Sequence, residues 1–299
     1  MILCYNNKKI KDGLFMIHYI ENEYLKIGIK EDGAELTSLI SKETEIEYLW
    51  QGNPDVWYGQ SPVLFPIIGR VLDDKYYLDG KEYTMPKHGL FRKRKAEFVE
   101  KNNNTIIFKE SADDETFKIF PFNFEVYVIF ELIDKALKVT HKIVNKDDKT
   151  MYFSIGGHPG FNCKIGDYLL FSENETLETI EIDTECLRTD KTIPVLSDDN
   201  KIIITKDIFN NDALIFTGMK SDTITLASDD HNRKVIFDYS DCSYLGIWAK
   251  PGAPYVCIEP WWGVNDSHER KDDISKKDAI ISLDAGSSFE CFWKAEISE

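Results

Sequence analysis

Two histidines in this sequence are flanked by glycine in segments that do not resemble ordinary strands. His88 precedes Gly89, and His158 lies between Gly157 and Pro159. Glycine allows a ligand to approach the backbone closely, and proline makes the backbone rigid. Because the ordinary pKa of imidazole is about 6.5, either side chain could exchange a proton near neutral pH. The alternative is that each histidine only satisfies the backbone groups of a turn.

A carboxylate occurs in similar surroundings further along the chain. Glu259 follows the apolar run 255–258 and precedes Pro260, Trp261 and Trp262. A carboxylate at the end of a buried strand is desolvated, which shifts its proton affinity unless a charge pairs with it. Indole rings beside a carboxylate often hold the apolar faces of a sugar, so we expect the two tryptophans to form a sugar platform. An ion pair with an arginine is the alternative for the carboxylate.

Arg70 follows the rigid, largely apolar segment 65–69, Phe-Pro-Ile-Ile-Gly. A guanidinium can donate forked hydrogen bonds to sugar hydroxyls or to a carboxylate, so this arginine is a candidate substrate-binding residue. A structural salt bridge is the alternative. If these residues form one site, we expect Arg70, His88, His158 and Glu259 to converge on a single cleft.

Charge and missing motifs argue against several classes of function. The net charge of −16 disfavours nucleic acid and anionic membrane surfaces as partners. The sequence has no run of about 18 apolar residues and no apolar signal region near its start, so we expect a cytoplasmic location. The six scattered cysteines predict free thiols. Metal-ligand pairs, a P-loop and a dinucleotide fingerprint are all missing, so we expect neither a metal nor a cofactor.

Alternating apolar and polar residues predict strands along most of the chain. The pattern is clearest over 122–132, and a second run over 137–143 meets a polar turn at 145–149 that leads into 151–153, which we expect to form a hairpin. The Asp-Gly pairs at 32–33 and 79–80 predict tight turns. Helical periodicity is nearly absent: 54–60 could form one short turn, and the acidic patch 113–115 is typical of a solvated loop. Further strands are predicted at 105–109, 202–205, 222–226, 234–239 and 288–293.

Many strands at short spacing, with few short helices, predict an all-β sandwich or barrel of antiparallel sheets. No linker and no internal repeat divides the chain. We therefore expect a single domain over residues 14–299, preceded by an N-terminal extension over residues 1–13.

Five motifs occur in an order that resembles the aldose 1-epimerase, or galactose mutarotase, superfamily, and most closely its LacX-like branch. The similarity runs from about Ile20 to the C-terminus. It implies a β-supersandwich, an all-β fold that agrees with the alternation, and a cofactor-free enzyme that interconverts the α and β anomers of a hexose. The motifs lie at 65–70, 77–83, 88–89, 157–161 and 258–261.

The resemblance also implies a role for each candidate residue. Anomers interconvert when the C1 hydroxyl loses its proton while the ring oxygen gains one, the open chain rotates about C1–C2, and both transfers reverse. By resemblance, Glu259 is the general base at the C1 hydroxyl and His158 the general acid at the ring oxygen. His88 would support the ring oxygen or share the acid role, and Arg70 would hold hydroxyls. Asp212 most nearly matches a further family carboxylate that binds hydroxyls, with an Asx turn at a strand start as the alternative.

The sequence departs from typical galactose mutarotases after both histidines. Those proteins carry a doubled glycine after the first histidine and an aromatic-Asn stretch after the second, whereas this chain reads His-Gly-Leu-Phe-Arg over 88–92 and His-Pro-Gly-Phe over 158–161. The His-Gly-x-x-Arg spelling also resembles the hexose-6-phosphate epimerase branch. Arg92 could therefore meet a phosphate, which leaves a free hexose and a sugar phosphate both open as substrates.

Two other classes of function stay open. A carbohydrate-binding or regulatory protein could keep the fold without turnover. A glycoside hydrolase or lyase on a β-sandwich would need a carboxylate pair, for which Glu259 with Asp212 is the candidate. The sequence is compatible with a monomer or a homodimer.

Overall fold

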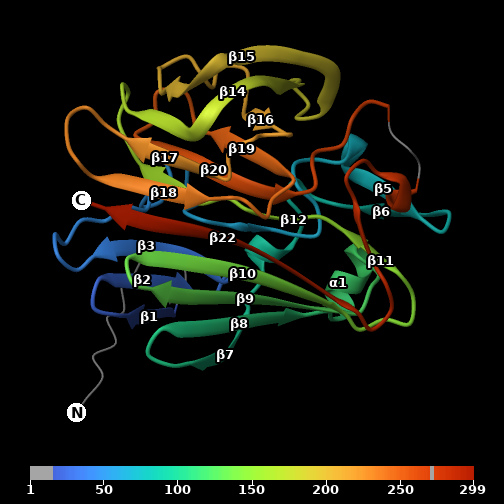
Figure 1. The fold of residues 1–299 in the computed structure, drawn as a ribbon. Coiled ribbons are helices and arrows are strands. Elements are labelled where there is room, and N and C mark those ends of the chain that lie inside the picture. Colours follow the sequence, from blue (N-terminus) through green and yellow to red (C-terminus); the bar gives the residue numbers. More distant parts are fainter. Residues whose placement is uncertain (1–15, 270–272) are drawn as a thin grey trace.

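The computed structural model describes residues 16–269 and 273–299 (Figure 1). Every pairing between its named strands is antiparallel, and its one α-helix among the described residues, α1 (Asp114–Ile119), has six residues. These observations confirm the predicted all-β fold of antiparallel sheets with few short helices. In the described residues no helix is long and apolar enough to span a membrane. The predicted extension over residues 1–13 lies outside the described residues.

The largest sheet has nine strands in the order β15-β14-β17-β18-β22-β10-β9-β8-β7. In Figure 1, β22 (red) crosses the middle of the molecule between β18 and β10. The last strand of the chain therefore joins strands from its two halves. The strands are β7 (Glu97–Lys101), β8 (Thr105–Ser111), β9 (Phe124–Ile133), β10 (Ala136–Asn145), β14 (Tyr168–Ile182), β15 (Arg188–Ile203), β17 (Thr223–Ala227), β18 (Lys234–Asp238) and β22 (Ser288–Ser298).

A second sheet of six strands has the order β16-β19-β20-β12-β4, with β13 also pairing with β20. There are three smaller sheets. One contains β1, β2 and β3, another pairs β5 with β6, and the last pairs β11 with β21. The six-stranded sheet comprises β4 (Val63–Leu64), β12 (Ile155–Gly157), β13 (Gly160–Asn162), β16 (Leu214–Phe216), β19 (Tyr244–Trp248) and β20 (Tyr255–Trp262). The small sheets comprise β1 (Ile17–Glu21), β2 (Leu25–Lys30), β3 (Glu35–Ser41), β5 (Lys75–Leu78), β6 (Lys81–Thr84), β11 (Met151–Phe153) and β21 (Ile281–Leu283).

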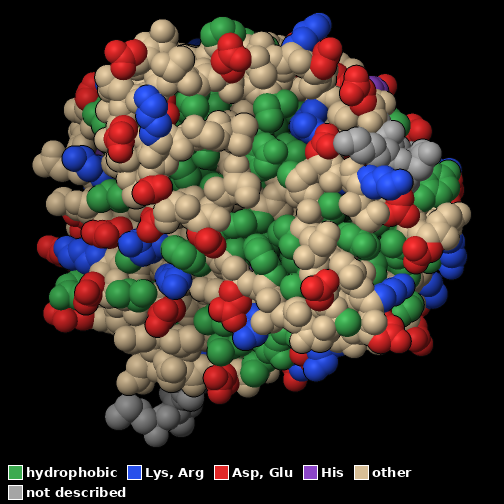
Figure 2. All heavy atoms as spheres, turned by 45° about the vertical axis from the view of Figure 1, so that its right-hand side comes forward, with side chains coloured by type: hydrophobic (Ala, Val, Ile, Leu, Met, Phe, Trp, Pro, Cys, Tyr) green, Lys and Arg blue, Asp and Glu red, His purple; other side chains and the backbone are tan. Residues whose placement is uncertain are grey.

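The sheets enclose a continuous apolar core. In β9, buried residues alternate with partly buried ones, as the sequence pattern predicts for a strand with one face on the core. The larger of two clusters of buried apolar side chains includes residues from Ile20 to Ile297, and the smaller one contains Trp261. Figure 2 shows acidic and basic side chains interspersed on one side of the molecule, with hydrophobic side chains visible between them. The continuous core supports the prediction of a single domain over 14–299, which stays a prediction.

The predicted hairpin between 137–143 and 151–153 is wrong. The strand over the first segment, β10, pairs with β9 and β22, while β11 pairs with β21. The tight turn falls before β10 instead, where Asp134 has a φ of 50°. At the end of β10, the Asn145 side chain donates hydrogen bonds to the carbonyls of Lys149 and Leu283, which tie the following segment to β21. Alternation identified the strands but not their partners.

The acidic patch over 113–115 starts a helix instead of forming a loop. Asp113 accepts hydrogen bonds from the N–H groups of Glu115 and Thr116, and Thr116 reaches back to the N–H of Asp113. This reciprocal capping satisfies the free N–H groups at the start of α1. Residues 54–60 form turns without a helix, and the three short 3-10 turns are η1 (Leu72–Asp74), η2 (Phe91–Lys93) and η3 (Ile274–Lys276).

Candidate active site

Strand β20 places Glu259 in the interior of the six-stranded sheet. All eight residues of this strand are buried, and its apolar side chains keep the carboxylate away from bulk water. On one side of β20 lies β19, with Gly246 opposite Glu259. On the other side lie β12 and β13, which flank His158 in the chain and both pair with β20. The imidazole Nε2 of His158 therefore lies 3.3 Å from a carboxylate oxygen, Oε1, of Glu259.

His88 reaches the same place from a tight turn. Its backbone φ is 64°, and that of Gly89 is 72°, so the chain reverses sharply here. The ring of His88 lies 5.9 Å from that of His158, at an angle of 81°. The N–H of Gly69 donates to Nδ1 of His88 at 3.2 Å, so in the neutral ring the proton is on Nε2. Burial lowers the pKa of His88 well below its ordinary value, which favours this neutral donor form.

Burial also dominates the protonation of the Glu259–His158 pair. Their side chains are 2% and 10% exposed. Burial raises the pKa of Glu259 well above its ordinary value, although Trp261 opposes this by donating its indole N–H to Oε2 at 3.2 Å. Burial lowers the pKa of His158 to about 3. Because each group resists carrying a lone charge, we infer that the pair holds one shared proton across the Oε1···Nε2 contact at neutral pH.

A cleft of about 850 Å³ opens over this pair. Its walls come from the turn at His88, the end of β14, the segment that leads into β16, and the strands β19 and β20. The cleft brings together six of the seven predicted site residues: His88, Arg92, His158, Asp212, Glu259 and Trp261.

Arg70 does not line this cleft, so the expected convergence of four residues is wrong for Arg70 and holds for the two histidines and Glu259. It borders a neighbouring hollow, where Nε donates to Asp74 at 2.6 Å and a terminal nitrogen donates to the second oxygen at 2.8 Å. A further nitrogen donates to the carbonyl of Glu185. The guanidinium is thus occupied by a carboxylate four residues along the chain. This is the salt bridge that the sequence left open as the alternative.

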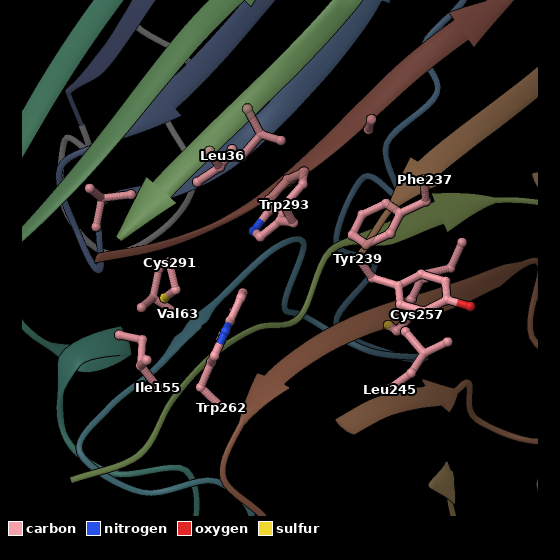
Figure 3. Close-up of a cluster of buried hydrophobic side chains, with 14 of the residues drawn as sticks. Leu36, Val63, Ile155, Phe237, Tyr239, Leu245, Cys257, Trp262, Cys291 and Trp293 are labelled. Carbon is pink, nitrogen blue, oxygen red and sulfur yellow. The ribbon is translucent and has the colours of Figure 1, made fainter. Parts of the chain in front are cut away.

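The two tryptophans after Glu259 have different environments, and neither offers an open face to a sugar. Adjacent residues of a strand point to opposite sides of the sheet. Trp261 lines the cleft but is 3% exposed, with its N–H on Glu259. Trp262 lies in the apolar core, where its N–H donates to the carbonyl of Asp241 (Figure 3). The platform prediction is therefore wrong for Trp262, and Trp261 instead holds the carboxylate.

Asp212 lies in the cleft, as a hydroxyl-binding carboxylate would, but its side chain bonds the next residue and does not form the Asx turn that was the alternative. It lines the cleft just before β16, and its Oδ1 accepts a hydrogen bond from the N–H of Ala213 at 2.8 Å. The backbone is left-handed here, with a φ of 74°. The second oxygen lies 3.9 Å from the sulfur of Cys186 and borders the cleft.

Sequence reasoning missed two tryptophans that pack on His158. The ring of Trp57 stacks on the imidazole at 5.0 Å and 28°, and Trp248 meets it edge-on at 5.6 Å. Both are only partly buried and line the cleft. Trp57 belongs to segment 54–60, which we expected to form only a turn. The adjacent aromatic residues Trp57 and Tyr58 were the one local feature that could have indicated a binding role. Trp248 follows a regular strand pattern, and its pairing opposite Cys257 brings it to the cleft.

Three buried donors, two of which line the cleft, are close enough together to hold a metal ion. Suitable atoms of His158, Cys257 and Glu259 all lie within 4.8 Å of one another, and all three residues are buried. A metal would require a thiolate and a carboxylate, because ligands bind deprotonated. Burial raises the pKa of Cys257 well above its ordinary value, as it does for Glu259. Burial thus favours the protonated thiol and carboxyl, so an ion would have to displace both protons to bind here.

Comparison with known proteins supports the resemblance seen in the sequence. A family model described as aldose 1-epimerase matches residues 16–268. Protein LacX (plasmid) of Lactococcus lactis subsp. lactis is 31% identical over 280 residues, which cover 88% of this chain and 93% of the relative. The chromosomal LacX protein of the same organism matches at the same identity.

Solved structures match the fold along nearly the whole chain. A galactose mutarotase related enzyme from Lactobacillus acidophilus has a TM-score of 0.91 and 32% identity, covering 95% of this chain and 98% of its own. A galactose mutarotase-like protein from Lactobacillus casei ATCC 334 has a TM-score of 0.90 and 31% identity, covering 94% and 100%. These matches confirm the expected mutarotase-like β-supersandwich.

Proposed function

This chain belongs to the aldose 1-epimerase family, and we propose that it is a mutarotase that interconverts the α and β anomers of a hexose by general acid–base ring opening. The observation that carries the proposal is the buried contact between Nε2 of His158 and Oε1 of Glu259 at the floor of the cleft. Family membership supports an isomerase that acts on carbohydrate. The proposal adds to this a substrate and a role for each residue.

The pair can exchange protons with a sugar without gaining or losing one overall. In the reactive form Glu259 is a carboxylate and His158 an imidazolium. Ring opening moves the C1 hydroxyl proton to Glu259 while His158 gives its proton to the ring oxygen, and the C1–ring oxygen bond breaks to leave an aldehyde. After rotation about C1–C2, the ring oxygen attacks the other carbonyl face and both transfers reverse. The pair holds one proton throughout, which agrees with the opposing pKa shifts of its members.

Neighbouring groups hold the pair in position. The indole N–H of Trp261 binds Oε2 of Glu259, which leaves Oε1 toward His158. Trp57 stacks on the imidazole and restricts its rotation. His88 has its free N–H on Nε2 and would stabilise negative charge at the ring oxygen, while Asp212 would accept hydrogen bonds from hydroxyls. We propose that Trp57 and Trp248 provide the apolar surface for the sugar ring in place of Trp262.

We predict that a fresh solution of one anomer relaxes faster with this protein than without it. The measurement is polarimetry or proton NMR on a panel of hexoses and hexose 6-phosphates, started from the pure α form. No acceleration with any sugar on the panel would contradict the proposal. Saturable binding without acceleration would favour a carbohydrate-binding protein, and release of reducing ends from oligosaccharides would favour a hydrolase.

Arg92 favours a sugar phosphate as the second candidate substrate. It lines the cleft, and its buried Nε has no hydrogen-bond partner among the described residues. A terminal nitrogen donates to the carbonyl of Lys87, whose own ammonium group also borders the cleft. Two cations at one wall of a cleft can bind a phosphate. Within the proposed function, this wall is where the phosphate of a hexose 6-phosphate would bind.

Replacing Arg92 with alanine separates the two substrate classes. If the substrate is phosphorylated, we expect its KM to rise about 10- to 100-fold, because a charged hydrogen bond contributes about 1.5–3 kcal/mol, with little change for a free hexose. The matched control is Lys93→Ala, which removes an exposed neighbouring cation that does not line the cleft. Equal KM changes for both substrate classes would argue against phosphate binding by Arg92.

The proposal also covers the cellular compartment, the domain organisation and the oligomeric state. The five cysteines that the structure describes are free, which supports a reducing compartment such as the cytoplasm. Organisation as one domain and a monomeric or homodimeric state stay predictions.

A further inference from the structure

A second hollow lies apart from the cleft, and the two share no lining residue. It has a volume of about 150 Å³, less than a fifth of that of the cleft. Its walls are the segment after β3, the end of β13 with the residues that follow it, and the loop between β17 and β18. His158 precedes β13, and this hollow lies beyond the other end of that strand.

Arg233 borders this hollow without a carboxylate partner. Three of the five arginines that the structure describes form salt bridges: Arg70, Arg94 and Arg188. The other two, Arg92 and Arg233, have no carboxylate within 4.0 Å among the described residues, and each lines a hollow. In a chain with 52 acidic and 36 basic residues, partners for an arginine are abundant. An arginine left without one is available to a ligand.

Further polar side chains line the same hollow. Lys164 and Lys234 also line the hollow, and neither has a carboxylate within salt-bridge distance in the described part of the chain. The Nδ1 atom of His231 is buried and has no hydrogen-bond partner there. A buried polar atom without a partner is costly, and a bound acceptor or water would satisfy it.

The two carboxylates in the wall have their own donors. Glu47 accepts hydrogen bonds from the Ser38 hydroxyl and from the N–H groups of Leu39 and Leu49. Burial raises the pKa of this carboxyl. Asp167 accepts the N–H of Lys164 on Oδ2 and is 6% exposed. The wall therefore offers an incoming molecule mainly unoccupied donors.

We propose that this hollow binds a small oxyanion, the phosphate or carboxylate group of a metabolite, at a site separate from the sugar cleft. Arg233 would donate paired hydrogen bonds to two oxygens, with His231 and the lysines on the remaining ones. Buried apolar residues at the base, Leu226 and Val235, would contact the rest of the molecule. The small volume suits a group of a few heavy atoms.

The test is a calorimetric titration with inorganic phosphate at constant ionic strength, with acetate as a second probe. It uses Arg92→Ala as the parent, so that phosphate bound in the cleft does not contribute. We expect Arg233→Ala to weaken the remaining binding by about tenfold or more, since a charge-assisted hydrogen bond is lost, and Arg233→Lys to weaken it less. Lys191→Ala removes an exposed cation that does not line the hollow and is expected to leave binding unchanged.

Two outcomes would overturn the site. One is no measurable heat with either probe, and the other is equal binding in the Arg233→Ala variant and its parent. An equal loss in Lys191→Ala would mean that only net charge matters, and would also refute it. Anomer relaxation is measured in parallel on Arg233→Ala in the otherwise wild-type chain. We expect a normal rate, so the binding result and the proposed function can fail separately.

Discussion

Glutamine in place of Glu259 is expected to slow catalysed anomer relaxation by about 10²–10⁴-fold, the usual contribution of a general acid or base. Glutamine keeps the size of the side chain and an oxygen that can accept the N–H of Trp261, so the pocket keeps its shape. It cannot take the C1 hydroxyl proton. It also cannot share a proton with His158, whose Nε2 lies 3.3 Å from the present carboxylate. The measurement is the rate of relaxation per enzyme molecule, followed by polarimetry.

The control is the same substitution at another buried carboxylate. Glu175 is 1% exposed, accepts the N–H groups of Lys220 and Ser221, and does not line the cleft. We expect Glu175→Gln to retain normal relaxation rates. Because Glu259 and His158 act as one unit, the double variant with His158→Gln should be hardly slower than Glu259→Gln alone. A Glu259→Gln enzyme within about threefold of the wild type would refute the assigned base.

The residues that line the floor of the cleft could be predicted because their neighbours in sequence mark them. Glycine beside His88 and His158 reflects sharp turns and close strand packing, and the apolar run before Glu259 reflects a fully buried strand. Both are local properties. Trp57 lies in turns far from the centre in sequence, so its stacking on His158 depends on how loops fold over the sheets. No local pattern specifies that contact.

The role of Arg70 shows a different limit. Its lead-in over 65–69 is buried, but the direction of a long side chain depends on the nearest available charge. Asp74 lies one short turn later and binds the guanidinium through both oxygens. Strand pairing is likewise not set by the local pattern. Alternation predicted the strand β10, but its hairpin partner β9 follows from the turn at Asp134 and from the hydrogen bonds of Asn145.

Alanine in place of Gly89 is expected to lower the free energy of unfolding by about 3 kcal/mol or more, at or above the upper end of what most single substitutions cost. The residue has a φ of 72°, which costs an L-residue about 1–2 kcal/mol on its own. A Cβ would also lie 2.1 Å from the carbonyl oxygen of Phe65 and 2.4 Å from its carbon. That carbonyl accepts the N–H of Leu90 at 2.8 Å. It belongs to a buried backbone that cannot move aside without breaking this bond.

Gly80 separates the two contributions to that loss. Its φ is 77°, but a Cβ there would meet nothing within 4 Å, so Gly80→Ala carries the backbone strain without the collision. We expect Gly80→Ala to cost about 1–2 kcal/mol, measured as the free energy of unfolding in urea. An equal loss in both variants would contradict the collision with Phe65. Because His88 adjoins Gly89, any folded Gly89→Ala protein should also relax anomers more slowly, whereas Gly80→Ala should not. This difference would show that the turn at Gly89, which forms an isolated bridge with Phe65, also holds the imidazole of His88 in the cleft.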